Sequence, residues 1–475
     1  MSTFGGLNTA YSGLVAARMG LDVVGQNIAN SNTQGYTRQR IDTSALSPTA
    51  PTGLFSSGIR IGQGVSVGGV ARLGSAQLDA QVRFSAGTAG YSAVRANSLS
   101  ALEGSLREPG ENGLSATLGE FWAGWQNLAN GSDTAPAAAL LLGTAAEVVG
   151  QVTQGHQAVS SEWTSVRTDL NGMVNELNSA ASQVAELNAR IRATLVSGGS
   201  ANEMLDQRTI LTTTIAALTG ATLREAADGT VDILIGGNAL VSGDRVHQLA
   251  TSGAATMASA MTELAPGVFD NTRLVWQESA RSGTPVTVDS GEIAGALSML
   301  TGGGPIVSAA RSYNSFAADL ATKVNDIYGQ PAFFQFDMSA AAATLSVIPT
   351  TGSEVRAGDS ALGPYDGSTA DAIAQLGAGK AVGPGGPIES PNSVWSRFVT
   401  MLAVSTQGEL KQAGVASSSA TAAAGQQLAN ASVDLDEENV NLLMFQHAYQ
   451  GAARVMTAVD EMLDTLINRT GLVGR

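Results

Sequence analysis

Both ends of this chain carry apolar side chains that recur every seven residues, and this repeat constrains its fold more than any other feature. Near the carboxyl terminus one set is Leu442, Tyr449, Met456 and Leu463, and the set between them is Phe445, Ala452, Val459 and Leu466. Near the amino terminus the repeat consists of Leu7, Leu14, Leu21 and Ile28, with Ala10, Ala17 and Val24 between them. A helix with this spacing lays one face along a partner helix. The repeats therefore predict two amphipathic helices that pack together, and we take their large apolar members as the candidate assembly seam.

The sequence also indicates where these two helices begin and end. Asp434 is placed to cap the first turn of the last helix, and Glu437, three residues later, is placed to complete a capping box. The first helix is predicted over residues 3–28. It is expected to stop in the Asn- and Gly-rich run at residues 30–35, which accepts the left-handed backbone that ends helices.

Two helices alone make a thin layer with little core. Burying one Leu side chain contributes roughly 1.5–3 kcal/mol, whereas ordering the backbone costs about 1–2 kcal/mol for every residue. We therefore expect the seam face to be unoccupied in a single chain and the terminal helices to need neighbours. Identical subunits in head-to-tail contact supply such neighbours, and a head-to-tail contact that does not close generates a helical tube. Folding on assembly is then expected.

Composition argues against several classes of partner. The chain has 475 residues, with 40 acidic and 25 basic side chains and a formal net charge of −15, so nucleic-acid binding is not expected. The only lysines are Lys323, Lys380 and Lys411, which argues against a polybasic membrane patch. Cysteine is absent, which excludes disulfides and thiolate chemistry. Because no run of 18 apolar residues occurs, we expect neither a cleaved signal peptide nor a membrane span.

Helices are also predicted through most of the middle of the chain. Apolar periodicity and helix terminators place them at residues 75–107, 114–129, 137–196, 202–219, 293–327 and 392–430. The longest of these has its own seven-residue repeat, made of Trp163, Leu170, Leu177, Val184 and Ile191. An aromatic stripe in the second helix of this series is interpreted as core packing; its members are Phe121, Trp122, Trp125 and Leu128.

Three segments have the turn residues and alternation of extended structure. Residues 36–70 are predicted to form a hairpin, in which a strand at residues 59–61 is followed by a turn at residues 62–64. Residues 221–290 are predicted to form a small β domain. Residues 331–391 are interpreted either as a reduced second insert or as an irregular loop, with two short strand candidates at residues 333–336 and 345–348.

The predicted fold class is mainly α with inserted β. It consists of a discontinuous helical-bundle and coiled-coil frame built from both chain ends, plus a small β domain. The expected parts are a terminal coiled-coil assembly domain (residues 1–34 and 434–475), a helical rod domain with the hairpin (35–220, 291–330 and 392–433), the inserted β domain (221–290), and the irregular or reduced second insert (331–391).

No group of residues in the sequence indicates catalytic, cofactor or metal chemistry. His156, His247 and His447 are far apart, and no pair has the spacing of metal ligands. The acidic run at residues 434–438 lacks the Gly and the bidentate Glu of a calcium loop. The glycines at residues 62–69 miss the spacing of a dinucleotide-binding turn. We therefore expect no enzyme activity, no cofactor and no metal.

Several short motifs resemble those of a known group of proteins. The first helix and its exit resemble the signature of flagellar rod, hook and hook-associated axial proteins, in Leu7-x-x-Ala10-x-Ser12-Gly13-Leu14, Leu21-Asp22-Val23, Asn27-Ile28-Ala29-Asn30 and Thr33-x-Gly35-Tyr36. Further motifs resemble the hook-associated protein 1 family of the hook–filament junction: Tyr36-Thr37-Arg38-Gln39, Leu205-Asp206-Gln207-Arg208, Val433-Asp434-Leu435-Asp436-Glu437-Glu438 and Gln446-x-x-Tyr449-Gln450.

This resemblance implies a structural protein of the bacterial flagellum. It implies export through the flagellar type III apparatus without a cleaved signal, with a cytoplasmic export chaperone on the last helix. It also implies assembly as a ring of identical subunits between the hook protein and the third hook-associated protein. Two alternatives stay open. One is another flagellar axial protein, either the third hook-associated protein or a hook protein, and the other is a secreted coiled-coil effector with a binding β domain.

Overall fold

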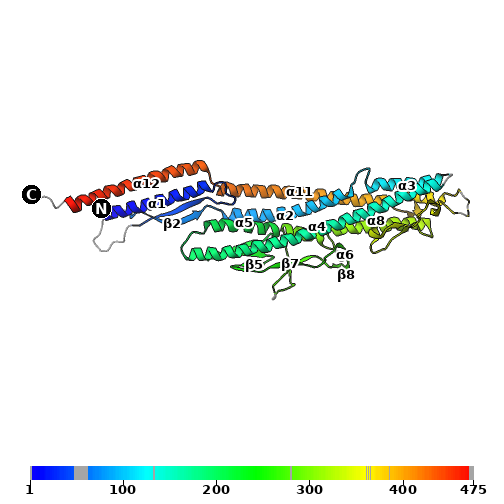
Figure 1. The fold of residues 1–475 in the computed structure, drawn as a ribbon, viewed down its shortest axis with the longest axis horizontal. Helices are drawn as coiled ribbons and strands as arrows, with labels where there is room; N and C mark the ends of the chain where they lie inside the picture. Colours follow the sequence, from blue (N-terminus) through cyan, green and yellow to red (C-terminus); the bar gives the residue numbers. More distant parts are fainter. Residues whose placement is uncertain are drawn as a thin grey trace, which may run out of the picture.

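The chain forms a long, narrow rod whose main helices run along its longest axis (Figure 1). The computed structural model describes residues 3–47, 62–131, 134–278, 281–359, 361, 363, 365–383 and 386–469. Helices α1 (Thr3–Ala29) and α12 (Leu435–Asp464) lie side by side at one end of the rod, as the two terminal repeats predict. A turn of π-helix at Thr465–Arg469 continues α12. The rest of the chain forms the body.

Except over residues 291–328, the long helices of the body agree with the predicted ones to within a few residues. They are α2 (Ala76–Leu106), α3 (Leu114–Asn130), α4 (Thr134–Val196), α5 (Asn202–Thr219), α7 (Gly291–Leu300), α8 (Pro305–Tyr328) and α11 (Pro391–Ala431). The caps explain why these limits are sharp. The Ser75 hydroxyl accepts a hydrogen bond from the Leu78 N–H at the start of α2, and the Ser390 hydroxyl does the same for Ser393 at the start of α11.

The predicted single helix over residues 293–327 is wrong, because a glycine-rich turn divides it into α7 and α8. Gly302 in this turn is held from two sides: its N–H donates to Asn271 Oδ1 of the insert at 2.7 Å, and its carbonyl accepts from Arg311 of α8 at 2.6 Å. A Cβ atom at Gly302 would lie 2.3 Å from the Phe269 ring. The close approach of this ring therefore requires glycine here.

One continuous apolar core runs through the body. The aromatic stripe of α3 is buried in it, as predicted, and so is the seven-residue repeat of α4 from Trp163 to Val184. Trp125 packs against Phe333 with ring centroids 5.0 Å apart, and Phe121 packs against Phe334 at 6.0 Å. Residues from the predicted irregular segment therefore complete the core at this end of the rod.

The segment of residues 221–290 is built of short antiparallel strands, as predicted. The four-stranded sheet consists of β3 (Thr222–Glu225), β4 (Val231–Ile235), β5 (Asn238–Ser242) and β6 (Arg245–Val246). The three-stranded sheet has the order β11 (Pro285–Val286), β10 (Arg273–Trp276), β7 (Leu249–Ser252). Helix α6 (Met257–Met261) and the hairpin of β8 (Glu263–Ala265) and β9 (Val268–Phe269) complete it. The two ends of the segment meet, since a Cβ atom at Gly220 would lie 2.7 Å from Ser290 Cβ.

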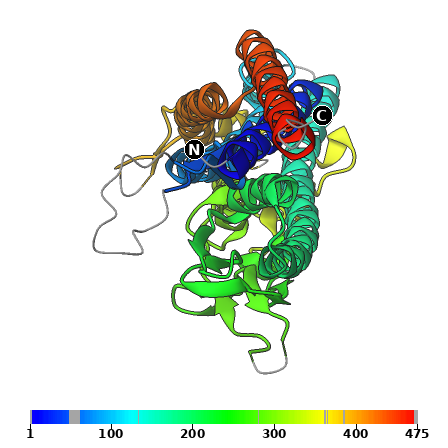
Figure 2. The same ribbon diagram turned by 90° about the vertical axis from the view of Figure 1, so that its left-hand side faces the viewer.

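This insert lies along α4 and does not project freely (Figures 1 and 2). Asn178 of α4 donates to the Leu249 carbonyl at 2.8 Å and accepts from the Leu249 N–H at 3.0 Å. Asn188 binds both backbone groups of Val231 in the same way, at 2.8 and 3.2 Å. Each amide thereby takes the place of a neighbouring strand. Apolar residues of the insert belong to the same core as α4.

The same pair of side-chain to backbone hydrogen bonds holds two other strand residues. Asn27 of α1 donates to the Gln39 carbonyl at 2.9 Å and accepts from its N–H at 3.0 Å. Asn325 of α8 donates to the Phe334 carbonyl at 2.8 Å and accepts from its N–H at 2.9 Å. We call these residues the clamp asparagines: Asn27, Asn178, Asn188 and Asn325.

Residues 331–391 form short elements that pack on the body. Both strand candidates are confirmed, because β12 (Phe334–Gln335) pairs with β13 (Ser346–Val347). The other elements are α9 (Ala341–Thr344), η1 (Gly352–Glu354), α10 (Ser368–Gly377), β14 (Val382–Gly383) and β15 (Gly386–Pro387). Helix α10 packs against α3 and α8, so this segment covers the end of the rod opposite the paired termini.

The hairpin is formed by β1 (Gln39–Ala45) and β2 (Val65–Arg72), which pack along α1. The predicted strand at residues 59–61 lies outside the described residues. The predicted turn at residues 62–64 is wrong, because Leu46 donates to the Gly64 carbonyl and accepts from the Gln63 N–H. These residues therefore extend the pairing of β1 with β2.

Two helical stretches, Ala135–Val196 and Gly291–Tyr328, are long and apolar enough to cross a membrane by length and composition alone. In their most apolar windows, 28% and 67% of the residues are buried inside the protein. Core helices pass the same test, and both stretches contribute side chains to the core. They are weak evidence for a membrane span.

Candidate assembly site at the paired chain ends

Helices α1 and α12 pack in antiparallel directions, and three glycines of α1 face residues of α12. The facing pairs, seven residues apart on each helix, are Gly6 with Val459, Gly13 with Ala452, and Gly20 with Phe445. A Cβ atom at Gly20 would lie 2.5 Å from the Phe445 ring. Glycine at this position therefore permits an approach that any side chain would obstruct.

The structure places the residues of the candidate seam in three settings. Phe445 and Val459 lie at the contact with α1. Half-buried positions are occupied by Leu7, Leu14, Leu21, Ile28, Leu442, Met456 and Leu463. Tyr449 and Leu466 are exposed. The expectation that the seam face is unoccupied in a single chain is therefore wrong, because α1 covers part of it.

The glycine repeat is the feature that the sequence reasoning missed. The leucines of α1 are each one residue away from the glycines at the closest approach, while Ala10, Ala17 and Val24 are buried as the repeat predicts. A large ring at Phe445 needs a small residue opposite it. The recurrence of Gly6, Gly13 and Gly20 every seven residues could have shown where that partner lies.

A buried ion pair closes the inner end of the paired helices. The Arg38 guanidinium lies 2.6 Å from Glu438 and 2.8 Å from Glu437. Glu438 is 1% exposed and also accepts a hydrogen bond from the Asn27 amide at 3.1 Å. Asp434 caps α12 as predicted. The predicted capping box is wrong, because the Glu437 carboxylate binds Arg38 instead of returning to the backbone of the cap.

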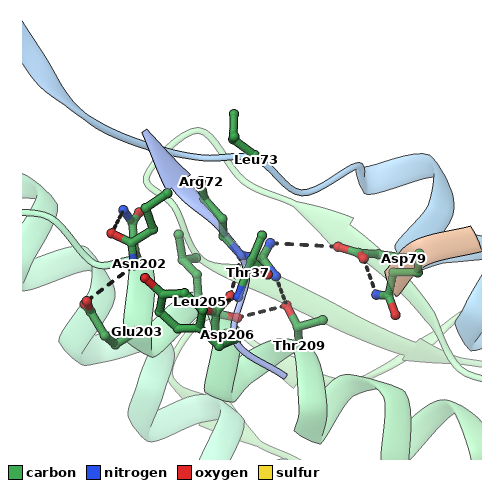
Figure 3. A network of polar contacts seen from close by, with 12 residues as sticks. Thr37, Arg72, Leu73, Asp79, Asn202, Glu203, Leu205, Asp206 and Thr209 are labelled. Atoms are coloured by element: carbon green, nitrogen blue, oxygen red, sulfur yellow. Dashed lines mark hydrogen bonds and ion pairs between the residues drawn. The ribbon is translucent and has the colours of Figure 1, made fainter. Parts of the chain in front are cut away.

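A second polar group joins the hairpin to the body (Figure 3). Asp206 of α5 accepts from the Thr37 N–H at 3.1 Å and pairs with Arg72 at 2.5 Å. Arg72 also lies 3.8 Å from Asp79 of α2, and it donates to Thr209 at 3.3 Å. These bonds fix the exit of α1 and the end of β2 against the first turn of α2. The paired helices are thereby attached to the body through charged hydrogen bonds.

Burial and neighbouring charges change proton affinities at this junction. Burial, and after it the neighbouring carboxylates of Glu203, Asp206 and Glu438, together raise the pKa of the Tyr36 phenol to about 12. The Tyr36 hydroxyl donates to Asn27 Oδ1 at 2.9 Å. The hydrogen bond from Arg38 lowers the pKa of Glu437. The phenol is therefore neutral and the exposed carboxylate is charged over a wide range of pH.

The motifs that carried the family resemblance converge here. Residues 36–39, 205–208 and 433–438 are far apart in sequence, yet they supply both polar groups just described. Arg208 differs from the others, since it points to the insert and donates to Asn188 and to the Gly229 carbonyl. The motifs thus mark the attachment of the terminal helices rather than a catalytic centre.

Helix α12 carries a second apolar stripe that α1 does not cover. Val440, Met444, Val455 and Met462 are 66, 53, 51 and 54% exposed. They are 4, 11 and 7 residues apart, a spacing that places them on one side of a helix. We call these residues the open stripe. An exposed apolar stripe of this length is typical of a surface that another protein covers.

Comparisons with known proteins identify the family. The model of the flagellar hook-associated protein FlgK helical domain matches residues 99–332. The model of the flagella basal body rod protein matches residues 7–37, and that of the flagellar basal body rod FlgEFG protein C-terminal region matches residues 425–469. Flagellar hook-associated protein 1 of Bacillus subtilis is 26% identical over 520 residues, covering 100% of both chains. The chain belongs to the flagellar hook-associated protein 1 family.

Further relatives agree with this family over parts of the chain. Flagellar hook-associated protein 1 of Salmonella typhimurium is 32% identical over 247 residues, which cover 51% of this chain and 44% of that protein. The structure of the flagellar hook junction protein FlgK from Burkholderia pseudomallei has the same fold, with a TM-score of 0.59. That match covers 73% of this chain and 99% of the other at 13% identity.

Membership of the hook-associated protein 1 family decides between the alternatives that the sequence left open. The helical-domain model matches the middle of the chain, which argues against a hook protein and against an unrelated secreted effector. The two rod-protein models match segments that contain most of α1 and all of α12. Among the described residues, no group of three or more His, Cys, Asp or Glu side chains could hold a metal ion.

Proposed function

We propose that this protein is a structural axial component of the flagellum that joins the hook to the filament. Its paired terminal helices pack with those of identical subunits, and repetition of that contact builds a ring or short tube. The observation that carries this proposal is the open stripe. Helix α12 has two apolar sides, and α1 covers one of them.

The energetics of the open stripe favour a contact repeated between many subunits. Each of its side chains is already about half buried, so complete burial contributes roughly 1 kcal/mol for each one. One such contact is too weak to offset the loss of rotational and translational freedom on association. Each subunit of a closed ring makes this contact on two sides, and the contact that closes the ring forms without a further loss of that freedom.

We propose a division of labour along the rod. Residues 1–34 and 434–475 form the terminal assembly domain, and the hairpin belongs with them because β1 and β2 pack along α1. The body forms a stiff spacer, and residues 221–290 widen it along α4. The names of the relatives support a position at the hook junction.

The proposed partners follow from this position. They are further copies of this chain, the hook protein on one side and the third hook-associated protein on the other. An export chaperone would cover the open stripe in the cytoplasm, and export through the flagellar apparatus would need no cleaved signal. The role is structural, without catalysis or a cofactor.

The test uses purified full-length protein, isolated hooks and electron microscopy. Met444→Asp places a charge on the open stripe, and Val268→Asp places the same charge on the exposed β9 strand of the insert. Both side chains are about half exposed, so neither change should unfold the single chain. Wild type and Val268→Asp should cap the hooks, whereas Met444→Asp should not. Equal capping by both variants would contradict the proposal.

A further inference from the structure

A cavity of about 330 Å³ lies where the body meets the insert. It is enclosed by the start of α2, the end of α4, α5, and strands β3 and β4. The charged residues that line it are Arg72, Arg83, Arg208, Asp79 and Glu225. The lining thus carries three positive and two negative side chains, and Asp206, which lies outside the lining, pairs with Arg72.

Two of these arginines form no ion pair with an acidic side chain in the described part of the chain. Arg208 is 9% exposed, and it donates only to the neutral oxygens of Asn188 at 2.9 Å and Gly229 at 2.7 Å. Arg83 forms no ion pair or hydrogen bond with any described residue. Burial lowers the pKa of both guanidinium groups. Arg72, in contrast, pairs with Asp206.

Neither acid of the cavity forms an ion pair with Arg83 or Arg208, although Asp79 and Glu225 raise the pKa of Arg83 and Glu225 raises that of Arg208. Asp79 accepts from Gln427, and its other oxygen lies 3.8 Å from Arg72. Glu225 is exposed, and it lies beyond ion-pair distance of any arginine in the cavity. A guanidinium taken out of water without an anion is costly. Among the described residues, Arg83 and Arg208 therefore line the cavity without a hydrogen-bonded anion.

We propose that this cavity binds a small tetrahedral oxyanion, such as inorganic phosphate, between Arg83 of α2 and Arg208 of α5. The forked guanidinium binds two oxygen atoms of one anion, and a tetrahedral anion presents oxygens to both helices at once. The cavity has room for one such ion with several waters. The bound ion joins the body to the first hairpin of the insert, because Arg208 also holds Gly229 between β3 and β4.

The test is a titration of the full chain with sodium phosphate, followed by calorimetry and by hydrogen exchange at β3 and β4. Phosphate should bind saturably and slow exchange in these strands. Arg83→Gln removes one guanidinium that holds no other group, so it should fold normally and bind phosphate at least tenfold more weakly. Arg273→Gln removes an exposed arginine of β10 and should bind phosphate like the wild type. Arg83→Lys keeps the charge and should bind with intermediate affinity.

Three results would overturn this proposal. The first is no saturable binding of either phosphate or sulfate by the wild type. The second is equal binding by Arg83→Gln and the wild type. The third is an equal slowing of hydrogen exchange in β3 and β4 by another salt. Sodium chloride with this effect at the same ionic strength would indicate general screening, and acetate with this effect at the same concentration would indicate a planar carboxylate site. Sulfate is titrated in parallel, and saturable binding of either oxyanion at this cavity supports the proposal.

Discussion

At the scale of single residues, Gly20 decides how closely the two ends of the chain approach. Gly20→Ala places a methyl group against the Phe445 ring and should destabilise the α1–α12 pair by about 1–3 kcal/mol, as overpacking does. Gly25→Ala on the same helix is the matched control, since nothing lies within 4 Å of its Cβ position. That change should stabilise α1 by up to about 1 kcal/mol.

Hydrogen exchange along α12 measures both effects. Protection of α12 should fall in Gly20→Ala and stay the same or rise in Gly25→Ala. If the amide protons of α12 are protected equally in the two variants, the glycine contact does not set the distance between these helices.

A substitution at Asn178 tests how much a clamp asparagine contributes to stability. Asn178→Asp keeps the shape of the side chain but removes the N–H that donates to the Leu249 carbonyl. The free energy of unfolding should fall by about 1–3 kcal/mol, because a carboxylate oxygen then faces the carbonyl oxygen of Leu249. Asn175→Asp, at an exposed position of the same helix, should cost little. Chemical unfolding compares the two, and the prediction fails if their midpoints are the same.

Tyr36 gives the junction a defined pH dependence. Its phenol has an ordinary pKa of 10.0 and a pKa of about 12 in the folded chain. The unfolded chain therefore loses this proton first, so stability is unaffected below about pH 10 and falls as the pH rises toward 12. Tyr36→Phe should make this decline shallower, and it should cost about 0.5–1.5 kcal/mol at neutral pH through the lost hydrogen bond to Asn27.

Unfolding free energies from about pH 8 to 12 measure that slope. Tyr365→Phe serves as the control, because Tyr365 is exposed. A slope that is unchanged in Tyr36→Phe would show that other groups cause the alkaline loss of stability.

At the scale of elements, apolar periodicity predicted most of the helices, but it could not locate their contacts. A period reports which side of a helix is apolar, and it does not report the partner. The glycines at 6, 13 and 20 contribute no apolar side chain to a repeat, so the closest contact was placed one residue away. The break between α7 and α8 depends on the fit of Phe269 against Gly302, which joins residues from separate elements.

The residues of the candidate site could be predicted from the sequence, but their contacts could not. The motif residues could be recognised, but their convergence around Arg38 and Asp206 depends on tertiary contacts between segments hundreds of residues apart. The clamp asparagines give no signal in a single sequence, because asparagine on a helix is ordinarily a solvated residue.

Removal of the insert is expected to destabilise the rod. Replacing residues 221–290 with a short Gly/Ser linker is geometrically simple, because the two ends meet at Gly220 and Ser290. The removal would uncover the side of α4 that carries Asn178 and Asn188, together with its apolar neighbours. The shortened chain should therefore melt at a lower temperature and bind an apolar dye more strongly.

A shortened chain with the melting temperature of the wild type would show that the insert is an independent module. In that case the shared core with α4 contributes little to the stability of the rod. Circular dichroism melting curves of both chains measure this directly.

At the scale of the whole molecule, the rod presents its two termini together at one end and its insert along one side (Figures 1 and 2). This arrangement suits an axial protein, because one end can pack against other subunits while the body stays rigid. The junction of Arg38, Arg72 and Asp206 transmits the position of the terminal helices to the body.

The central claim is that the open stripe of α12 is exposed in the single chain and covered in the assembly. Because the chain has no cysteine, one introduced thiol reports on one position. Met444→Cys lies on the open stripe, and Ser282→Cys lies at an exposed loop of the insert. Maleimide labelling is measured on the purified single chain and on the same protein assembled on isolated hooks. Both thiols should react in the single chain, and in the assembly only the thiol at 282 should react. Equal labelling of the thiol at 444 in both states would contradict the account.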